Sequence, residues 1–194
     1  MLDSKKAAQL FSAIFSPVGI AFYTTVIFSV FSPIVQTNYN ILISIILGII
    51  FLCILPIIGI FYQYFIGKVD LWVSNQKKRT PLYITAIIVY IIGAIIFYYI
   101  DYKIMFILTM AYVSVTTVVM IANFFTKVSS HTAGVAGPIT ALSIVYGIVA
   151  LPLFIMLPLT IWARLKLKAH DILQLIAGTI IAIIVTSIVY IILF

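Results

Sequence analysis

Long apolar stretches separated by short polar breaks run along the whole chain. A transmembrane helix needs about 20 apolar residues, and most of these stretches are close to that length. Isoleucine and valine dominate them, yet helices are still predicted, because backbone polar groups inside a bilayer must be paired within their own segment. The predicted helical segments are 11–35, 41–66, 82–100, 103–123, 133–149, 151–163 and 171–194.

The stretch 133–163 is predicted to form two short helices rather than one long one. It contains Pro138, Pro152 and Pro158, and the turn is expected between Gly147 and Pro152. Each half would rise only about 20–25 Å at 1.5 Å per residue, which is less than the roughly 30 Å of a bilayer core. The chain is therefore expected to cross the membrane about six to seven times.

The composition excludes an ordinary soluble domain. Hydrophobic residues make up 65% of the chain and charged residues 8%, and the mean hydropathy is +1.32. Soluble domains carry roughly a quarter charged residues. These values predict an all-α, multi-pass membrane bundle that forms one integral-membrane domain over residues 1–194, with no room for a separate soluble domain.

The basic residues lie almost entirely on one side of this predicted topology. If each segment crosses once, the N-terminus and the breaks 67–81, 124–132 and 164–170 share a face that holds ten of the eleven basic residues. The positive-inside rule then predicts a cell-membrane protein with this face in the cytoplasm. The formal charge of +7 is explained by loops beside anionic headgroups, so nucleic acid is not an expected partner.

The rarest polar residues also gather on this face. Arg79, His131, Arg164 and His170, which are both arginines and both histidines of the chain, fall in its three longer loops. Two guanidinium groups, with Lys127 nearby, present planar donors that match phosphate oxygens. Histidine can serve as a nucleophile or a general acid near neutral pH. The loops are therefore predicted to form one site that cleaves a phosphate ester.

Several other chemistries lack the residues that they need. The chain has no glutamate, and its four aspartates form no DxxD or DxxxD pair that could hold Mg²⁺ on a diphosphate. A zinc site of His131, His170 and an aspartate would have no two ligands at helical i, i+4 spacing. No GxxxxGK[ST] or GxGxxG follows a strand-like segment. We therefore expect no metal and no cofactor, and paired-aspartate prenyl transfer is disfavoured.

The three loops resemble the motifs of the type 2 phosphatidic acid phosphatase superfamily of membrane lipid phosphatases. Those motifs read KxxxxxxRP, PSGH and SRxxxxxHxxxD, in this order. Residues 163–170 read ARLKLKAH and keep the arginine-to-histidine spacing, and residues 128–131 read VSSH. Residues 79–81 read RTP, with one residue inserted before the proline, and Trp72 stands where the family has lysine. The resemblance covers about residues 70–180.

The resemblance implies the family's helical core and a metal-independent reaction. His170 would attack phosphorus and form a phosphohistidine, and His131 would protonate the leaving alcohol oxygen. The substrate would be a phosphomonoester or diphosphate of a lipid or isoprenoid. The residues expected to hold its phosphate oxygens are Arg79, Arg164, Ser129 and Lys78, with Lys127 added from its position alone.

One position departs from the family in a way that affects the chemistry. Gln174 stands where the family has the aspartate that orients the nucleophilic histidine and stabilises its positive charge. Its amide oxygen can accept the ring N–H but carries no full charge. Asp171 is expected to point elsewhere, since neighbours in a helix do not share a face, whereas Asp70 in the first loop could reach the histidine.

Three functions therefore remain open at the level of the sequence. The leading expectation is a lipid phosphate phosphatase. The second is a protein of the same fold that binds phosphorylated lipids without turnover or transfers the phosphoryl group. The third is a small transporter or scaffold whose loop cations only anchor the helices to headgroups.

Overall fold

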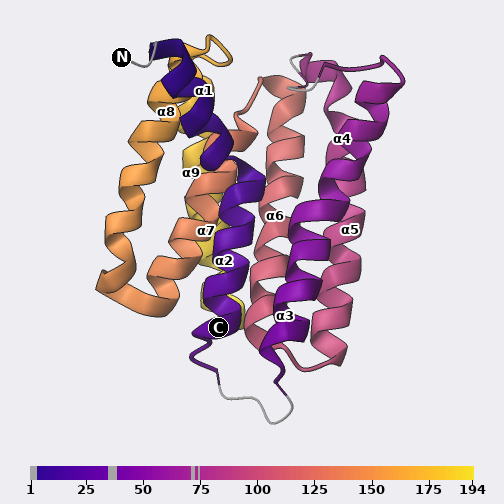
Figure 1. Ribbon diagram of the computed structural model, residues 1–194, viewed down its shortest axis with the longest axis vertical. Coiled ribbons are helices and arrows are strands. Elements are labelled where there is room, and N and C mark those ends of the chain that lie inside the picture. Colours follow the sequence, from indigo (N-terminus) through magenta and orange to yellow (C-terminus); the bar gives the residue numbers. More distant parts are fainter. Residues whose placement is uncertain (1–3, 35–38, 71–72, 74) are drawn as a thin grey trace.

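The computed structural model describes residues 4–34, 39–70, 73 and 75–194 (Figure 1). Every regular element in these ranges is a helix, which confirms the all-α prediction. The α-helices are α1 (Ser4–Ile14), α2 (Pro17–Val30), α3 (Ile41–Gly48), α4 (Leu55–Phe65), α5 (Thr80–Tyr99), α6 (Lys103–Phe125), α7 (Ser130–Tyr146), α8 (Met156–Lys166) and α9 (Ile172–Leu193). A π-helical turn, η1 (Ile49–Ile54), joins α3 to α4, and two 3-10 segments are η2 (Gln76–Lys78) and η3 (Gly147–Ile155).

Five helical stretches are long and apolar enough to cross a membrane, or six if the bent pair α1–α2 counts as one span. The chain is thus a candidate multi-pass membrane protein, with slightly fewer spans than predicted from the sequence. The five stretches are Ile41–Phe65, Gln76–Tyr99, Lys103–Phe125, Ser130–Lys166 and Ile172–Leu193.

The difference in span number comes from the stretch Ser130–Lys166, whose 37 helical residues count once. Its two halves nevertheless run in opposite directions, with α7 and α8 joined at η3 (Figure 1). The turn begins at Gly147, which has a positive φ of 65° that favours glycine. The helical hairpin predicted for residues 133–163 is therefore present.

The first predicted segment, 11–35, is wrong in its bounds. The structure has two helices here, bent by 43°, and α2 already ends at Val30. Pro17 cannot donate an intrahelical hydrogen bond and suits the first turn of a new helix. The Ser16 side chain caps that turn by accepting from Gly19 N at 3.1 Å. A hydropathy window about 19 residues wide averages across this break and cannot detect it.

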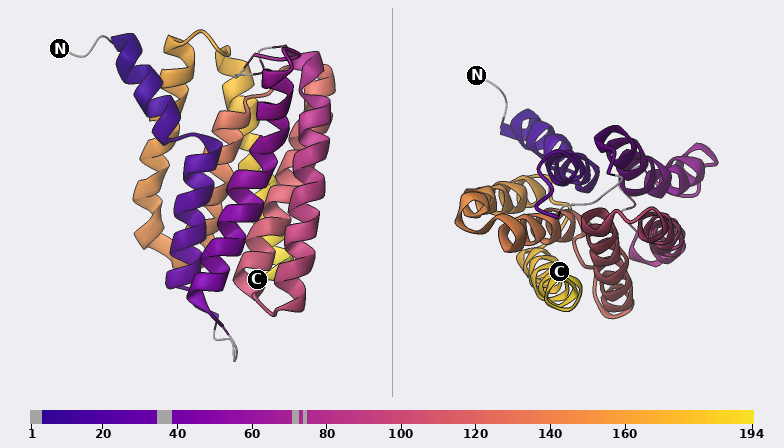
Figure 2. Two further views of the ribbon diagram at one scale, coloured as in Figure 1. Left: turned by 45° about the vertical axis from the view of Figure 1, so that its right-hand side comes forward. Right: turned by 90° about the horizontal axis from the view of Figure 1, so that it is seen from below.

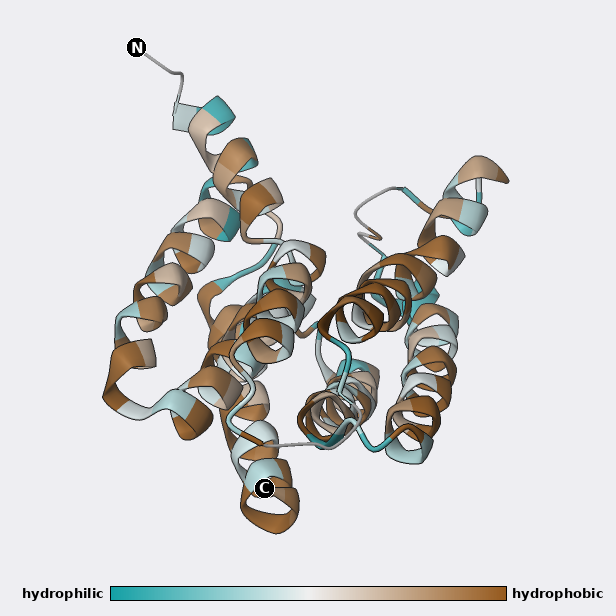
Figure 3. Ribbon diagram, turned by 60° about the horizontal axis from the view of Figure 1, so that its bottom comes forward, coloured by the Kyte–Doolittle hydropathy of each residue, from teal (hydrophilic) through white to brown (hydrophobic). Residues whose placement is uncertain are grey.

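The loops that carry the predicted site residues meet at one end of the bundle, which is the end where α1 begins (Figure 1). Viewed from other sides, α1 leans against α8, while α2 packs against α7 and α3 (Figure 2). Hydrophobic residues dominate the helices (Figure 3). The expected gathering of the three loops on one face is therefore correct.

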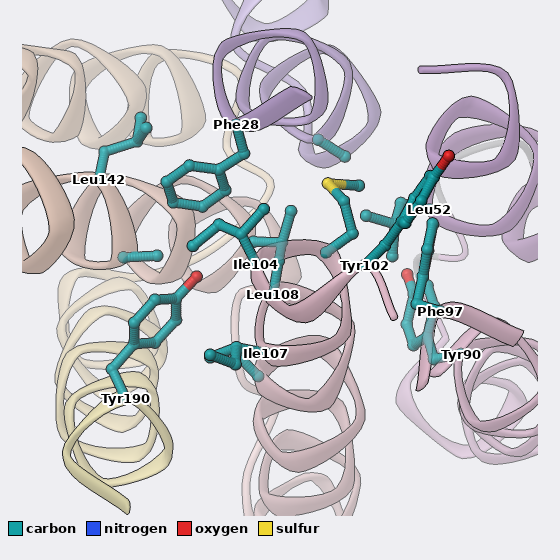
Figure 4. Packing of buried hydrophobic residues seen from close by; sticks show 14 of the residues in the cluster. Phe28, Leu52, Tyr90, Phe97, Tyr102, Ile104, Ile107, Leu108, Leu142 and Tyr190 are labelled. Atoms are coloured by element: carbon teal, nitrogen blue, oxygen red, sulfur yellow. The ribbon is translucent and has the colours of Figure 1, made fainter. Parts of the chain in front are cut away.

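The interior of the bundle is packed with large apolar side chains from helices far apart in the sequence (Figure 4). Phe28 of α2, Ile104 and Leu108 of α6 and Tyr190 of α9 are almost fully buried in one cluster. Outward-facing residues are also apolar, and Phe125 is 85% exposed. A soluble protein rarely exposes such a surface, whereas the hydrocarbon of a bilayer would cover it.

Candidate active site

A cavity of about 350 Å³ lies inside the bundle, and Arg79, His131, Arg164 and His170 all belong to its wall. Each of these four residues lies in or next to a loop at one end of the bundle. The rest of the wall comes from the start of α2, from η1, from residues further along α4 to α7 and from Thr186 of α9, and it is mostly apolar. Examples are Ile57, Ala86, Leu108, Val115 and Pro138. The cavity thus has a cationic, histidine-containing end and an apolar body.

The starts of α7 and α9 are fastened together, and this contact positions both histidines. Ser129 N donates to Gln174 O at 3.2 Å, and Thr132 Oγ1 donates to Leu175 O at 2.9 Å. The helices approach so closely that a Cβ on Gly178 would lie 2.5 Å from Ser129 O. Because His131 follows this contact on α7 and His170 precedes it on the α9 side, the two rings face one cavity.

His170 is held by Gln174, as the sequence suggested. The His170 side chain is 8% exposed, and its Nδ1 lies 2.8 Å from Gln174 Oε1. An amide oxygen only accepts hydrogen bonds, so the ring donates from Nδ1. In the neutral imidazole, Nε2 then carries the lone pair, which is the form a nucleophile needs.

The expectation that Asp171 would point away from this pair is wrong. Asp171 accepts from Gln174 N at 2.9 Å and from Gln174 Nε2 at 2.7 Å. The rule that neighbouring residues of a helix do not share a face does not apply here. Asp171 is the N-cap of α9, with extended backbone angles, and is not inside the helix. Asp70, the other candidate for orienting His170, is exposed, and its charge acts on Lys127.

Arg79 is held rigidly at the cavity by backbone carbonyl groups. It is 7% exposed, and its Nε and Nη1 donate to Val73 O at 2.9 Å and Val128 O at 3.0 Å. These contacts tie the loop before α5 to the loop before α7. Carbonyl oxygens orient the guanidinium without cancelling its charge, so the cation remains able to attract an anion.

Arg164 is the second buried cation, at 4% exposure. Its Nη1 donates to Ser12 Oγ of α1 at 3.1 Å. Ser12 is 1% exposed, and sequence reasoning missed it, because a single serine within an apolar stretch carries no recognisable pattern. The contact adds to the packing of α1 on α8, and it makes α1 part of the support of the site.

Three residues predicted to bind phosphate lie outside the cavity wall that the described residues form. Lys127 Nζ donates to Ala169 O at 3.0 Å, so it links two of the loops. Ser129 is buried and caps α7 with its hydroxyl. Lys78 is exposed, and its Nζ donates to Lys68 O. Their geometry supports structural roles in the loops.

The structure adds a hydroxyl pair that the motif comparison did not identify. Ser130 and Tyr83 both line the cavity, and their hydroxyl oxygens lie 2.8 Å apart. Matching to the family motif favoured Ser129, but at the start of α7 the side chain that reaches the cavity belongs to the next residue. Trp72, which stands at the family's lysine position, lies outside the described residues.

The charges at this end of the cavity act on one another. Arg164, His170 and Arg79 all contribute to the field at His131. Burial, together with the nearby charges of Arg79 and Arg164, lowers the pKa of Lys127. Burial also lowers the pKa of His170 to about 4, although its hydrogen bond to Gln174 opposes the shift. His170 is therefore neutral at physiological pH.

This depressed pKa makes stability depend on pH. In the unfolded chain His170 takes up its proton near pH 6.5, whereas the folded chain resists protonation until about pH 4. Between these values the unfolded state binds more protons, so stability falls as the pH is lowered, by up to about 1.4 kcal/mol per pH unit. The His170→Gln protein lacks this titrating group, so its stability should fall less than that of the wild type between pH 6.5 and 4.5. Thermal unfolding midpoints measured across this range test the expectation. Parallel curves for the two proteins would contradict the burial of a neutral ring.

Comparisons of the chain with protein-family models, with curated proteins and with solved structures each found no match. The family resemblance thus depends on the loop residues themselves. A helical bundle hosts many activities, so it is the chemistry and geometry of the site that bear on function.

Proposed function

We propose that this chain is an integral-membrane lipid phosphate phosphatase that cleaves a phosphomonoester or diphosphate of a lipid or isoprenoid. One observation carries the proposal: His131, His170, Arg79 and Arg164 come from three separate loops and line the same end of a mostly apolar cavity. A phosphate group fits the chemistry of the cationic end. An alkyl or isoprenyl chain fits the chemistry of the apolar body.

The reaction would proceed in two displacements at phosphorus. The negative charge of the bound phosphate lets His131 take up a proton from solvent. Nε2 of His170 then attacks phosphorus while the bond to the ester oxygen breaks, and His131 gives that proton to the leaving alcohol. Water then attacks the phosphohistidine, with His131 accepting its proton, and inorganic phosphate leaves. His170 returns to its neutral form, ready for the next substrate.

The two arginines would stabilise the negative charge on the transferring phosphoryl group. This charge is spread over three oxygens in the transition state, and preorganised cations there contribute strongly to phosphoryl transfer. Arg79 is fixed by two backbone carbonyls and Arg164 by Ser12. Such anchored guanidinium groups need little reorganisation during the reaction.

The sidedness of the site follows from the charge distribution and belongs to the proposal. The end of the bundle that carries the site also carries ten of the eleven basic residues, so the positive-inside rule assigns it to the cytoplasm. The enzyme would then draw its lipid from the inner leaflet and release phosphate into the cytoplasm.

Phosphate release by the purified protein in EDTA tests this function. The panel should contain phosphatidate, phosphatidylglycerophosphate, and isoprenyl phosphates and diphosphates, with His170→Ala as the blank. We expect release from at least one lipid by the wild type alone, because the mechanism uses histidine and arginine without a metal. Release that requires an added divalent cation, or that persists in the blank, would contradict the mechanism.

Gln174 favours one alternative, which is a protein of this fold that binds phosphorylated lipids or passes the phosphoryl group to an acceptor other than water. An amide stabilises a positive imidazole less than a carboxylate does. Saturable binding of a panel lipid without phosphate release would support this alternative. If variants at His131, His170 and Arg164 changed neither binding nor release, a transporter or scaffold would be favoured.

A further inference from the structure

The Gln174 side-chain amide lies between the imidazole ring of His170 and the carboxylate of Asp171. Its oxygen lies 2.8 Å from His170 Nδ1, and its nitrogen donates to Asp171 Oδ2 at 2.7 Å. We infer that Asp171 is a positioning residue, which acts through Gln174 to hold His170 in the tautomer with its proton on Nδ1. For its effect on catalysis the inference rests on the proposed function, but the tautomer itself can be measured without turnover.

The orientation of Gln174 follows from what each partner can accept. A glutamine amide can present either its oxygen or its NH₂ group to a neighbour, and the two ends have nearly the same shape. An ionised carboxylate only accepts hydrogen bonds, so Asp171 draws the NH₂ end toward itself. The oxygen must then face the imidazole, and an oxygen there accepts a proton from Nδ1.

The tautomer decides whether His170 can react. A neutral imidazole has one N–H and one lone pair. With the proton on Nδ1, the lone pair is on Nε2, which is not engaged by Gln174. If the Gln174 amide were flipped, its NH₂ group would face the ring and favour the other tautomer. The lone pair would then be on Nδ1, which Gln174 blocks. Asp171 therefore excludes the unreactive arrangement.

Asp171 is itself fixed in place by the start of α9. Its Oδ1 accepts from Gln174 N at 2.9 Å as the N-cap of the helix, which leaves Oδ2 directed at the amide. A negative charge is also favoured at a helix N-terminus. The carboxylate missing beside the histidine is thus present one amide group further away, where it polarises the hydrogen-bonded chain.

The first test is nitrogen NMR of protein labelled with ¹⁵N-histidine, in which the two neutral tautomers give distinct shifts. His131→Gln identifies the His170 signals. We expect wild-type His170 to show the Nδ1–H form near pH 7. Asp171→Asn should mix the two tautomers, because an asparagine amide can turn either end to Gln174. Asparagine is as good an N-cap as aspartate, so α9 should still form.

The matched control is Asp101→Asn, which removes one carboxylate at the opposite end of the bundle. Asp101 is exposed and has a positive φ of 59°, a conformation that asparagine also tolerates. This variant should leave the His170 tautomer and the rate of phosphate release unchanged. Asp171→Asn should lower kcat by about tenfold to a hundredfold, the usual effect of losing the partner of an orienting group, with little change in KM.

Moving the carboxylate from position 171 to position 174 distinguishes two roles of Asp171, which are the positioning of His170 and the capping of α9. Gln174→Glu alone places two carboxylates against each other and should be impaired. In the double variant Asp171→Asn/Gln174→Glu, the carboxylate accepts from Nδ1 directly and the asparagine can donate to it. This double variant should recover at least the wild-type rate. Its His170 should also titrate at higher pH, because an adjacent carboxylate stabilises the imidazolium form.

Two results would overturn the inference: an Nε2–H tautomer in the wild type, or an Asp171→Asn protein with unchanged tautomer and kcat. Failure of the proposed function has a different signature. In that case no variant releases phosphate, yet the Nδ1–H form of His170 still depends on Asp171.

Discussion

His170→Gln should lower the rate of phosphate release by about 10⁴-fold or more. This is the effect expected when the nucleophile is removed from a set of catalytic residues that act together. Glutamine is polar and similar in length, so the buried site should survive, but its amide cannot form the phosphoenzyme. Steady-state release from the best lipid of the panel measures the effect. A variant that retained more than about one hundredth of the wild-type rate would exclude His170 as the nucleophile.

His131→Gln is the informative companion, because it should affect the two steps unequally. A lipid alcohol is a poor leaving group and needs a proton, so the rate with lipid should fall strongly. With p-nitrophenyl phosphate the leaving group needs no acid, and the first step should proceed. Base-stable, acid-labile phosphoprotein should then accumulate in His131→Gln and be absent from His170→Gln. Equal loss of both steps would argue against the assigned acid.

Gly178→Ala should disrupt the site without altering any polar residue. The added Cβ would lie 2.5 Å from Ser129 O and 2.6 Å from Thr132 Oγ1, and the first of these atoms is backbone. Overpacking of this kind costs about 1–3 kcal/mol. It would push the start of α7 away from α9 and separate the two histidines. We expect a lower unfolding midpoint together with a loss of phosphate release beyond what the lost stability explains.

The control for this variant is Gly59→Ala in α4, where the nearest atom to the new Cβ would be Thr85 Cγ2 at 3.4 Å. That distance is an ordinary contact with a side chain, so stability and activity should stay near wild type. If Gly178→Ala behaved like Gly59→Ala, the close approach of α7 and α9 would not be needed to position the histidines.

The helical class and the shared face of the three loops could be predicted because hydropathy and rare polar residues are properties of the sequence itself. Few positions in this chain tolerate a histidine or arginine, so Arg79, His131, Arg164 and His170 stood out against an apolar background. The number of crossings between them fixes the side of each loop, whereas their meeting at one cavity depends on how the helices pack.

Other features depend on local geometry that the residue types do not reveal. The bend at Pro17 lies within a stretch that passes as a single membrane span when the two helices are taken together. Ser130 reaches the cavity and Ser129 does not, because Ser129 is used as the cap of α7. Asp171 was expected to follow the rule for residues inside a helix, but it stands just before the helix begins. In each case the position relative to a helix terminus decides the role.

The hairpin of α7 and α8 has a consequence for how the protein is made. Residues 132–163 contain no Asp, Glu, Lys, Arg or His, and at the turn Ile148 and Val149 are each 80% exposed. The backbone of the turn is hydrogen-bonded within the 3-10 segment η3, as a lipid-exposed chain requires. During biosynthesis the two helices can thus enter the bilayer together from the loop side, without translocating a single charge. The start of α7 with His131 and the end of α8 with Arg164 are left behind at the surface, where the proposed function needs them.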